Sequence, residues 1–155
     1  MINKLRLWGL GLGIVGGLLC IQSVQAVETA PAISIRFGEF YKMPVGPEGL
    51  EPSEKLLALA NKPVSLLGYV VDQNPPIEGH IILSPLPVLI DQQDESLADD
   101  LPPSAVFVHF DPHNPSLAES LTQSKGKLIV VQGVLTLGPQ EEADGRVSQI
   151  QLRME

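Results

Sequence analysis

The sequence predicts a mainly β fold, a small OB-like five-stranded barrel with one short helix between strands three and four. Apolar residues alternate in several segments, and proline and glycine turns separate these segments. The elements also follow the order strand, strand, strand, helix, strand, strand, which is the connectivity of the OB barrel. An open, antiparallel sandwich built from the same strands is the alternative.

Residues 1-26 have the pattern of a signal peptide. Two basic residues precede an apolar run from Leu7 to Ile21, which is shorter than the roughly twenty residues that a membrane helix needs. Small residues then offer a cleavage site after Ala26. We therefore expect a periplasmic or secreted chain with no stable membrane insertion after cleavage. An uncleaved anchor and a lipoprotein attached at Cys20 are the alternatives.

The exported chain is expected to be strongly acidic. The whole chain has 10 basic and 18 acidic residues, and removal of Lys4 and Arg6 leaves a net charge of 8 − 18 = −10. No Lys or Arg lies between Lys62 and Lys125, so a basic stripe along the central strands is missing. These features argue against nucleic acid as a partner. The single cysteine is Cys20, so disulfides are not expected to stabilise the exported chain.

Residues 27-61 are expected to form a preface to the β domain. The alternation of Ile33, Ile35 and Phe37 with polar residues predicts a strand, which Phe40 and Tyr41 are expected to continue past the intervening glycine. The prolines and glycines that follow exclude regular structure.

A short helix is predicted at the end of this preface. Ser53 is a suitable cap for a helix from Glu54 to Ala60, and Asn61 is a suitable stop because Asn tolerates the left-handed conformation. A helix of this length is not stable alone, so we expect it to pack on the sheet.

Residues 62-155 are expected to form the OB-like β domain, organised around a strand from Pro63 to Gln73 with a bend at Gly68. The further predicted strands are His80–Leu83, Ala105–Phe110, Lys127–Leu137 and Arg146–Met154, with Leu86–Ile90 as an edge or a separate extended piece. The other predicted elements are a solvated acidic loop Asp91–Pro103, a helix from Pro115 to about Thr122 capped by Asn114, and an acidic hairpin loop Pro139–Gly145.

Four short motifs together span most of residues 33–154. They are Asn61-Lys62-Pro63-Val64 with Leu67-Gly68-Tyr69-Val70, Ile82-Leu83-Ser84-Pro85, Leu101-Pro102-Pro103 with Val106-Phe107-Val108, and Val131-Gln132-Gly133-Val134-Leu135-Thr136-Leu137-Gly138. With these motifs the chain resembles a family of exported bacterial proteins of uncharacterised function with a small OB-like domain. Many members carry a cysteine-containing stretch after the second motif. This chain has none there, so a thiol or thiolate-metal role is not implied.

One cluster of residues has the composition of a metal site. In extended backbone His109, Asp111 and His113 point to the same side, and a hairpin of the second and third strands would bring His80 beside them. Imidazole and carboxylate ligands suit Zn or Cu. The alternative is that Asp111 opens a turn and the histidines are ordinary strand and turn residues.

The sequence favours a non-catalytic periplasmic binding or accessory module that meets a protein, a glycan or a small molecule. The alternative is a metal-binding protein that uses His80, His109, Asp111 and His113. A weaker alternative is a hydrolase that uses carboxylates of the acidic loop between Asp91 and Asp100. No catalytic residue is assigned, because the chain has no G-x-S-x-G motif.

Overall fold

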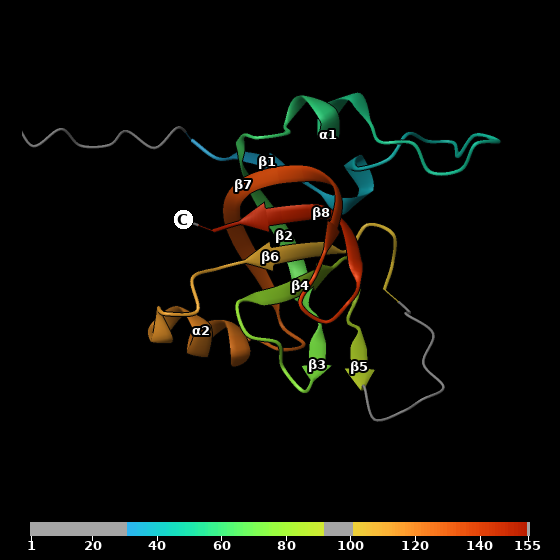
Figure 1. Ribbon diagram of the computed structural model, residues 1–155. Coiled ribbons are helices and arrows are strands. Elements are labelled where there is room, and N and C mark those ends of the chain that lie inside the picture. Colours follow the sequence, from blue (N-terminus) through green and yellow to red (C-terminus); the bar gives the residue numbers. More distant parts are fainter. Residues whose placement is uncertain (1–30, 92–100, 155) are drawn as a thin grey trace, which may run out of the picture.

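The computed structural model describes residues 31–91 and 101–154, and the fold is mainly β (Figure 1). The strands are β1 (Ile33–Ile35), β2 (Pro63–Val70), β3 (Asp72–Asn74), β4 (His80–Ser84), β5 (Leu89–Asp91), β6 (Val106–His109), β7 (Leu128–Glu141) and β8 (Val147–Arg153). The helices are η1 (Phe37–Glu39), a 3-10 helix, α1 (Glu54–Ala58) and α2 (Pro115–Thr122). Across the two described ranges, these helices are too short or too polar to span a membrane.

Strand β2 is central to the sheet. It pairs antiparallel with β4 and with β7, and β1 adds to it in parallel. Strand β4 pairs with β6, β6 pairs in parallel with β8, and β8 pairs with β7, so the series of pairings returns to β2. Strands β3 and β5 form a separate two-stranded parallel sheet. The predicted strand Pro63–Gln73 is therefore central, but the chain divides it into β2 and β3.

The strands bury side chains on two sides because successive residues of a strand point in opposite directions. Val64, Leu66 and Val70 of β2 belong to the main core, together with Phe40 and Leu56 of the preface. A second, smaller cluster lies on the other side of β4 and β6. Its buried members are Val71, Ile82, Ile90, Ala105 and Phe107.

The prediction that the first strand continues through Phe40 and Tyr41 is wrong. Strand β1 ends at Ile35, and the chain turns through η1. The rings of Phe37 and Phe40 then contact each other, with centroids 5.3 Å apart. In a strand, residues three apart point to opposite faces, so only the turn allows both rings to pack together.

The predicted helix caps are confirmed. Ser53 Oγ accepts a hydrogen bond from the Leu56 amide at 3.0 Å, and Asn114 accepts one from the Leu117 amide at the start of α2. Helix α1 ends at Ala58, slightly before the predicted end, and Asn61 has the expected left-handed backbone with φ 59°. Helix α2 ends at Thr122, as the sequence predicts.

The predicted hairpin loop Pro139–Gly145 is wrong in its first half, because β7 continues to Glu141. A proline is tolerated there because the register of β7 against β8 shifts between Leu137 and Gln140. The turn itself is tighter, and the Glu142 amide donates to the Arg146 carbonyl at 2.8 Å.

The extended piece predicted at Leu86–Ile90 becomes β5, which pairs with β3. Helices α1 and α2 lie at opposite ends of the strands in Figure 1. The predicted signal peptide 1–26 and most of the predicted acidic loop lie outside the described residues.

Candidate functional site

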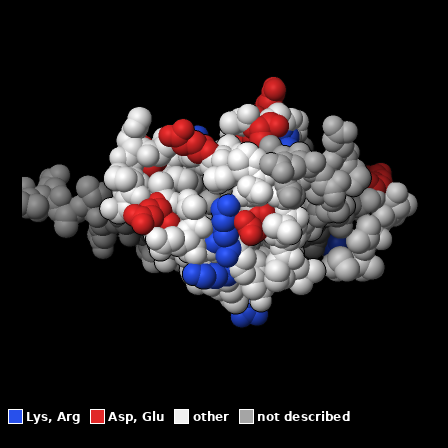
Figure 2. Space-filling model, turned by 90° about the horizontal axis from the view of Figure 1, so that it is seen from below, with Lys and Arg blue, Asp and Glu red and all other residues white. Residues whose placement is uncertain are grey.

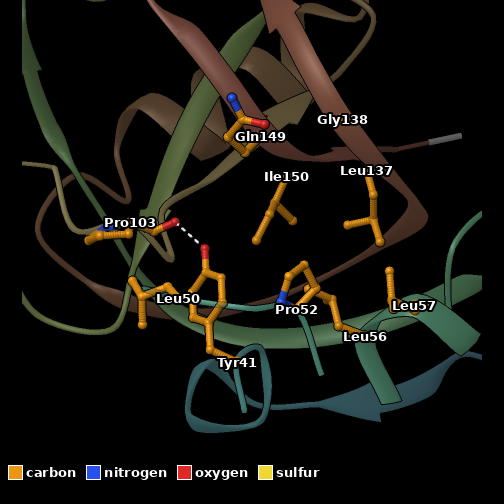
Figure 3. Close-up of a pocket in the computed structure, with 10 residues that line it drawn as sticks. All are labelled: Tyr41, Leu50, Pro52, Leu56, Leu57, Pro103, Leu137, Gly138, Gln149 and Ile150. Carbon is orange, nitrogen blue, oxygen red and sulfur yellow. Dashed lines mark hydrogen bonds between the residues drawn. The ribbon is translucent and has the colours of Figure 1, made fainter. Parts of the chain in front are cut away.

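A pocket of about 490 Å³ lies between the preface and strands β7 and β8 (Figure 3). Its residues come from three separate parts of the chain and are mostly apolar. The pocket is lined by Tyr41, Leu50, Pro52, Leu56, Leu57, Pro103, Leu137, Gly138, Gln149 and Ile150.

Helix α1 supplies two neighbouring leucines with different roles. Ser53, its cap, also donates its hydroxyl hydrogen to the Glu39 carbonyl at 2.6 Å, which fixes the helix on the chain that precedes it. Leu56 is only 1% exposed and belongs to the core, whereas Leu57 is 54% exposed. Leu57 therefore gives the pocket an exposed apolar side chain, while Leu56 stays packed in the core.

Tyr41 fixes one wall of the pocket. Its hydroxyl donates a hydrogen bond to the Pro103 carbonyl at 2.6 Å, which joins the preface to the segment before β6 (Figure 3). Burial raises the pKa of Tyr41, so the phenol stays protonated and remains a donor at neutral pH. This hydrogen bond therefore holds the wall of the pocket in position.

The lining of the pocket is almost entirely non-ionisable. Tyr41 is the one ionisable side chain among the ten lining residues, and its hydroxyl is already bonded to Pro103. General acid–base catalysis needs a positioned proton donor or acceptor within reach of the substrate. Gln149 offers a neutral amide beside the apolar walls.

A smaller pocket of about 170 Å³ adjoins the first one and shares Pro103 and Gln149 with it. Its other walls include Phe107, Arg146 and Ser148. Ser148 belongs to a polar network under the β7–β8 hairpin, so this pocket is more polar than its neighbour.

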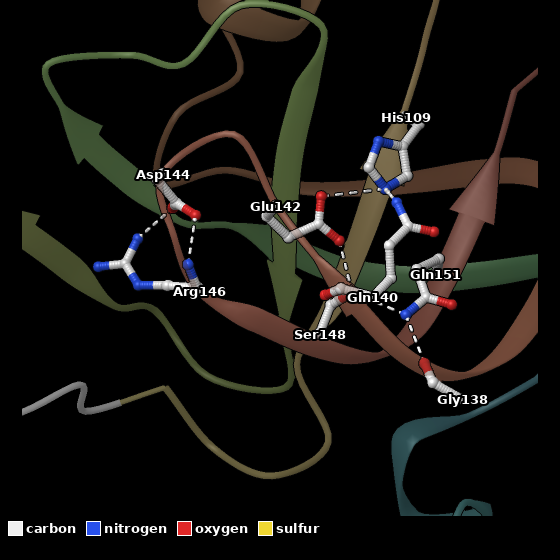
Figure 4. A network of polar contacts seen from close by, with 8 residues as sticks. All are labelled: His109, Gly138, Gln140, Glu142, Asp144, Arg146, Ser148 and Gln151. Atoms are coloured by element: carbon white, nitrogen blue, oxygen red, sulfur yellow. Dashed lines mark hydrogen bonds and ion pairs between the residues drawn. The ribbon is translucent and has the colours of Figure 1, made fainter.

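The polar network centres on Glu142, which is buried (Figure 4). The Ser148 hydroxyl donates to Glu142 Oε1, and Glu142 Oε2 lies 3.4 Å from His109 Nε2. The Gln151 amide donates to Ser148 Oγ at 2.7 Å and to the Gly138 carbonyl at 2.9 Å. These bonds satisfy a carboxylate that is otherwise costly to bury.

The network does not have the geometry of a nucleophile and its base. The Ser148 hydroxyl bonds to a carboxylate rather than to the imidazole, and Ser148 is only 2% exposed. An activated serine needs a base that accepts its proton and access to substrate. The network instead joins the two strands of the hairpin.

The sequence did not indicate this network. Gln149, Gln151 and Arg153 alternate with apolar residues in the last strand, which predicts an exposed polar side, but the structure buries Gln151 at 3% exposure. Gln151 lies on β8 between β6 and β7 in the sheet, and its amide bonds to Gly138 and Ser148 of the β7–β8 hairpin. A regular alternation of polar residues along a strand does not show which of them hydrogen bonds within the fold bury.

The structure brings two of the four predicted metal ligands together. His80 and His109 lie opposite each other on β4 and β6, with ring centroids 5.8 Å apart. His80 also packs on Phe107 at 5.7 Å, and burial lowers the pKa of His80. His109 faces Glu142 rather than Asp111.

The other two residues belong to a turn. Asp111 Oδ1 accepts a hydrogen bond from the backbone amide of His113 at 2.9 Å, as in an Asx turn. Over residues 31–91 and 101–154, no group of three or more His, Cys, Asp or Glu side chains is arranged to hold a metal ion. The Zn or Cu site stays a prediction that this geometry does not favour.

Comparison with known proteins gives little further guidance. No protein-family model matches the chain, and no curated protein matches it either. Among solved structures, the chain is similar to the crystal structure of a DUF3299 family protein from Pseudomonas aeruginosa PAO1, with 11% identity over 79% of this chain and 92% of that chain and a TM-score of 0.46.

Proposed function

We propose that this protein is a non-catalytic periplasmic binding module, and that the pocket of Figure 3 holds a small molecule with an apolar body. The pocket itself is the observation that carries the proposal. Its volume of about 490 Å³ lies within the range of about 300–1,000 Å³ that is typical of small-molecule sites.

The class of ligand follows from the lining. Leucine, isoleucine and proline side chains form most of the walls, and Gln149 and the Gly138 backbone supply polar contacts. Among the described residues that line the pocket there is no Lys, Arg, Asp or Glu, so a charged ligand body would lose hydration without gaining a partner from them. The ligand we propose is neutral and mainly apolar, with at most a polar end group near Gln149.

The proposal includes an OB-like five-stranded barrel as the scaffold. The series of pairings through β2, β4, β6, β8 and β7 returns to β2, which supports closure of the sheet. Helix α2 follows β6 and precedes β7, the position between the third and fourth strands where an OB barrel has its helix.

The proposed location and the exclusion of nucleic acid rest on sequence and surface. The apolar run and the cleavage site after Ala26 support export. On the face shown in Figure 2, the Lys and Arg side chains form a short group beside acidic side chains rather than a long stripe. Nucleic-acid binding normally needs an extended basic surface.

Binding of Nile red, a neutral apolar dye, tests the proposal. We expect a saturable rise of dye fluorescence with the folded protein and its reversal by 1-octanol. Leu57→Gln should weaken binding because Leu57 borders the pocket and is 54% exposed, so the fold does not depend on it. Leu128→Gln is the matched control, since Leu128 is 50% exposed and does not line the pocket.

Two outcomes contradict the proposal. One is dye fluorescence that does not saturate in the folded protein. The other is an equal loss of affinity in the Leu57 and Leu128 variants, with both folds intact by circular dichroism, because the dye would then bind to the exposed surface in general.

A further inference from the structure

A third and smaller cavity lies at the other end of the molecule, between the start of β4 and the end of α2. The space between the atoms of the cavity, counted together with its opening to solvent, is about 310 Å³. The centre of a water-sized group can occupy about 20 Å³ of this space. That inner room is enough for one small polar group and too small for a ring. Gln73, His80, Phe110, Thr122 and Lys125 are among the residues that line it.

Two residues that line this cavity each carry a buried side-chain nitrogen atom without a hydrogen-bond partner. These atoms are Gln73 Nε2 and His80 Nε2, and among the described residues no other buried side-chain nitrogen or oxygen lacks one. Gln73 is 4% exposed and His80 is 3% exposed. Both residues line the same cavity although they come from different strands.

Unpaired polar groups at this depth are costly. A buried donor without a partner costs about 1–3 kcal/mol, so two of them in one small cavity indicate a place for an acceptor. The amide Nε2 of Gln73 is a donor, and the neutral imidazole of His80 donates from Nε2 in one of its two tautomers. The two nitrogens can therefore both donate to oxygen atoms of one group.

A cation completes the set of donors. Lys125 lines the cavity, donates from Nζ to the Gln73 backbone carbonyl at 2.6 Å and lies 3.4 Å from Asp72 Oδ1. Its side chain is 27% exposed, so it stands between the cavity and solvent. The face seen in Figure 2 also shows Lys and Arg side chains grouped near its centre, with acidic side chains beside them.

We propose that this cavity binds the carboxylate group of a small organic acid, with Gln73 Nε2 and His80 Nε2 donating to its oxygens and Lys125 balancing its charge. Asp72 is the acidic group in contact with Lys125, and the incoming carboxylate shares the ammonium with it. Phe110 and Ile77 give the cavity an apolar part of its wall. This site is separate from the pocket of Figure 3.

Formate and formamide are a matched pair of probes, because they have almost the same size and only formate is charged. The purified protein is titrated with sodium formate, formamide and sodium chloride at equal ionic strength, and the melting temperature is followed. We expect a saturable rise with formate alone. The nitrogen resonance of the His80 ring should shift with the same saturation, whereas that of His113, which lies in a turn, should not.

Gln73→Met tests the donor directly, because methionine keeps the length of the side chain and removes the amide. We expect formate affinity to fall by about tenfold or more, since a hydrogen bond to a charged group is lost. Gln132→Met is the control, since Gln132 is exposed on β7.

Several results of these measurements would contradict the proposal. Equal binding of formamide, no saturation with formate, or equal affinity in the two methionine variants would each overturn the proposal. If Gln73→Met does not fold, the shift of the His80 resonance in the unaltered protein decides the question alone. A crystal structure grown in formate that shows only water between the two nitrogens would also overturn it.

Discussion

Replacement of Gly133 by alanine should be the most damaging small change in the sheet. Gly133 lies on β7 opposite Val64 of β2. A methyl group on Gly133 would lie 2.5 Å from the Arg153 carbonyl oxygen, 2.8 Å from its carbon and 3.1 Å from Leu152 Cγ. The obstacle is backbone of β8, which is held by its pairing with β6 and β7 and has no rotamer to change.

The expected loss is therefore at the upper end of the usual range for overpacking, about 3 kcal/mol of unfolding free energy. Gly38→Ala is the matched control, because a methyl group on Gly38 meets nothing within 4 Å, and we expect a change within about 0.5 kcal/mol. Equilibrium denaturation in urea measures both. A midpoint for Gly133→Ala equal to that of the control would refute the close approach of β7 and β8.

Three further predictions concern Gly68, Tyr41 and His80. Gly68→Val should lower the free energy of unfolding by about 1–3 kcal/mol. The added side chain would first meet the ring of Phe37, at 2.8 Å, and this ring can move, so the loss should be smaller than the added bulk alone implies. An unchanged urea midpoint would contradict this. Tyr41→Phe should lower the free energy of unfolding by about 1 kcal/mol, because the hydrogen bond to the Pro103 carbonyl is lost, and calorimetry measures this loss. The same substitution should weaken the binding of Nile red. Burial lowers the pKa of His80, against the opposing effect of Asp144 and Glu142 and with a smaller contribution from His109 and Arg146. The folded state then binds fewer protons than the unfolded state, so stability should fall as pH drops below about 6.5, and less steeply in His80→Phe; parallel urea midpoints between pH 7.5 and 5.5 would contradict it.

The parts of the fold that depend on local chemistry were predictable from the sequence. Ser53 and Asn114 cap their helices through their own side chains, and Asn61 adopts the left-handed conformation that its residue type tolerates. The apolar run that begins at Pro63 predicts a strand, which the structure has as β2. Each of these depends on residues within a few positions of one another.

The parts that depend on distant contacts were not predictable. The hydrogen bond from Tyr41 to Pro103 joins residues 62 positions apart, so no local pattern points to the pocket it closes. Phe40 has the spacing of a strand continuation, but the chain turns through η1 and Phe40 packs in the core against Phe37. In the candidate metal site, the pairing of two predicted strands was enough to predict that His80 lies opposite His109. His113 instead belongs to a turn, in which its backbone amide donates to Asp111.

The central claim is that the pocket between the preface and strands β7 and β8 binds an apolar small molecule. Methyl resonances of the leucine and isoleucine side chains in the intact protein, recorded during a titration with 1-octanol, test it most directly. We predict saturable shifts at Leu57, Leu137 and Ile150, which line the pocket, and none at Leu67, which is 51% exposed elsewhere on β2. Shifts that grow linearly without saturation, or that are as large at Leu67 as at Leu137, would contradict the claim.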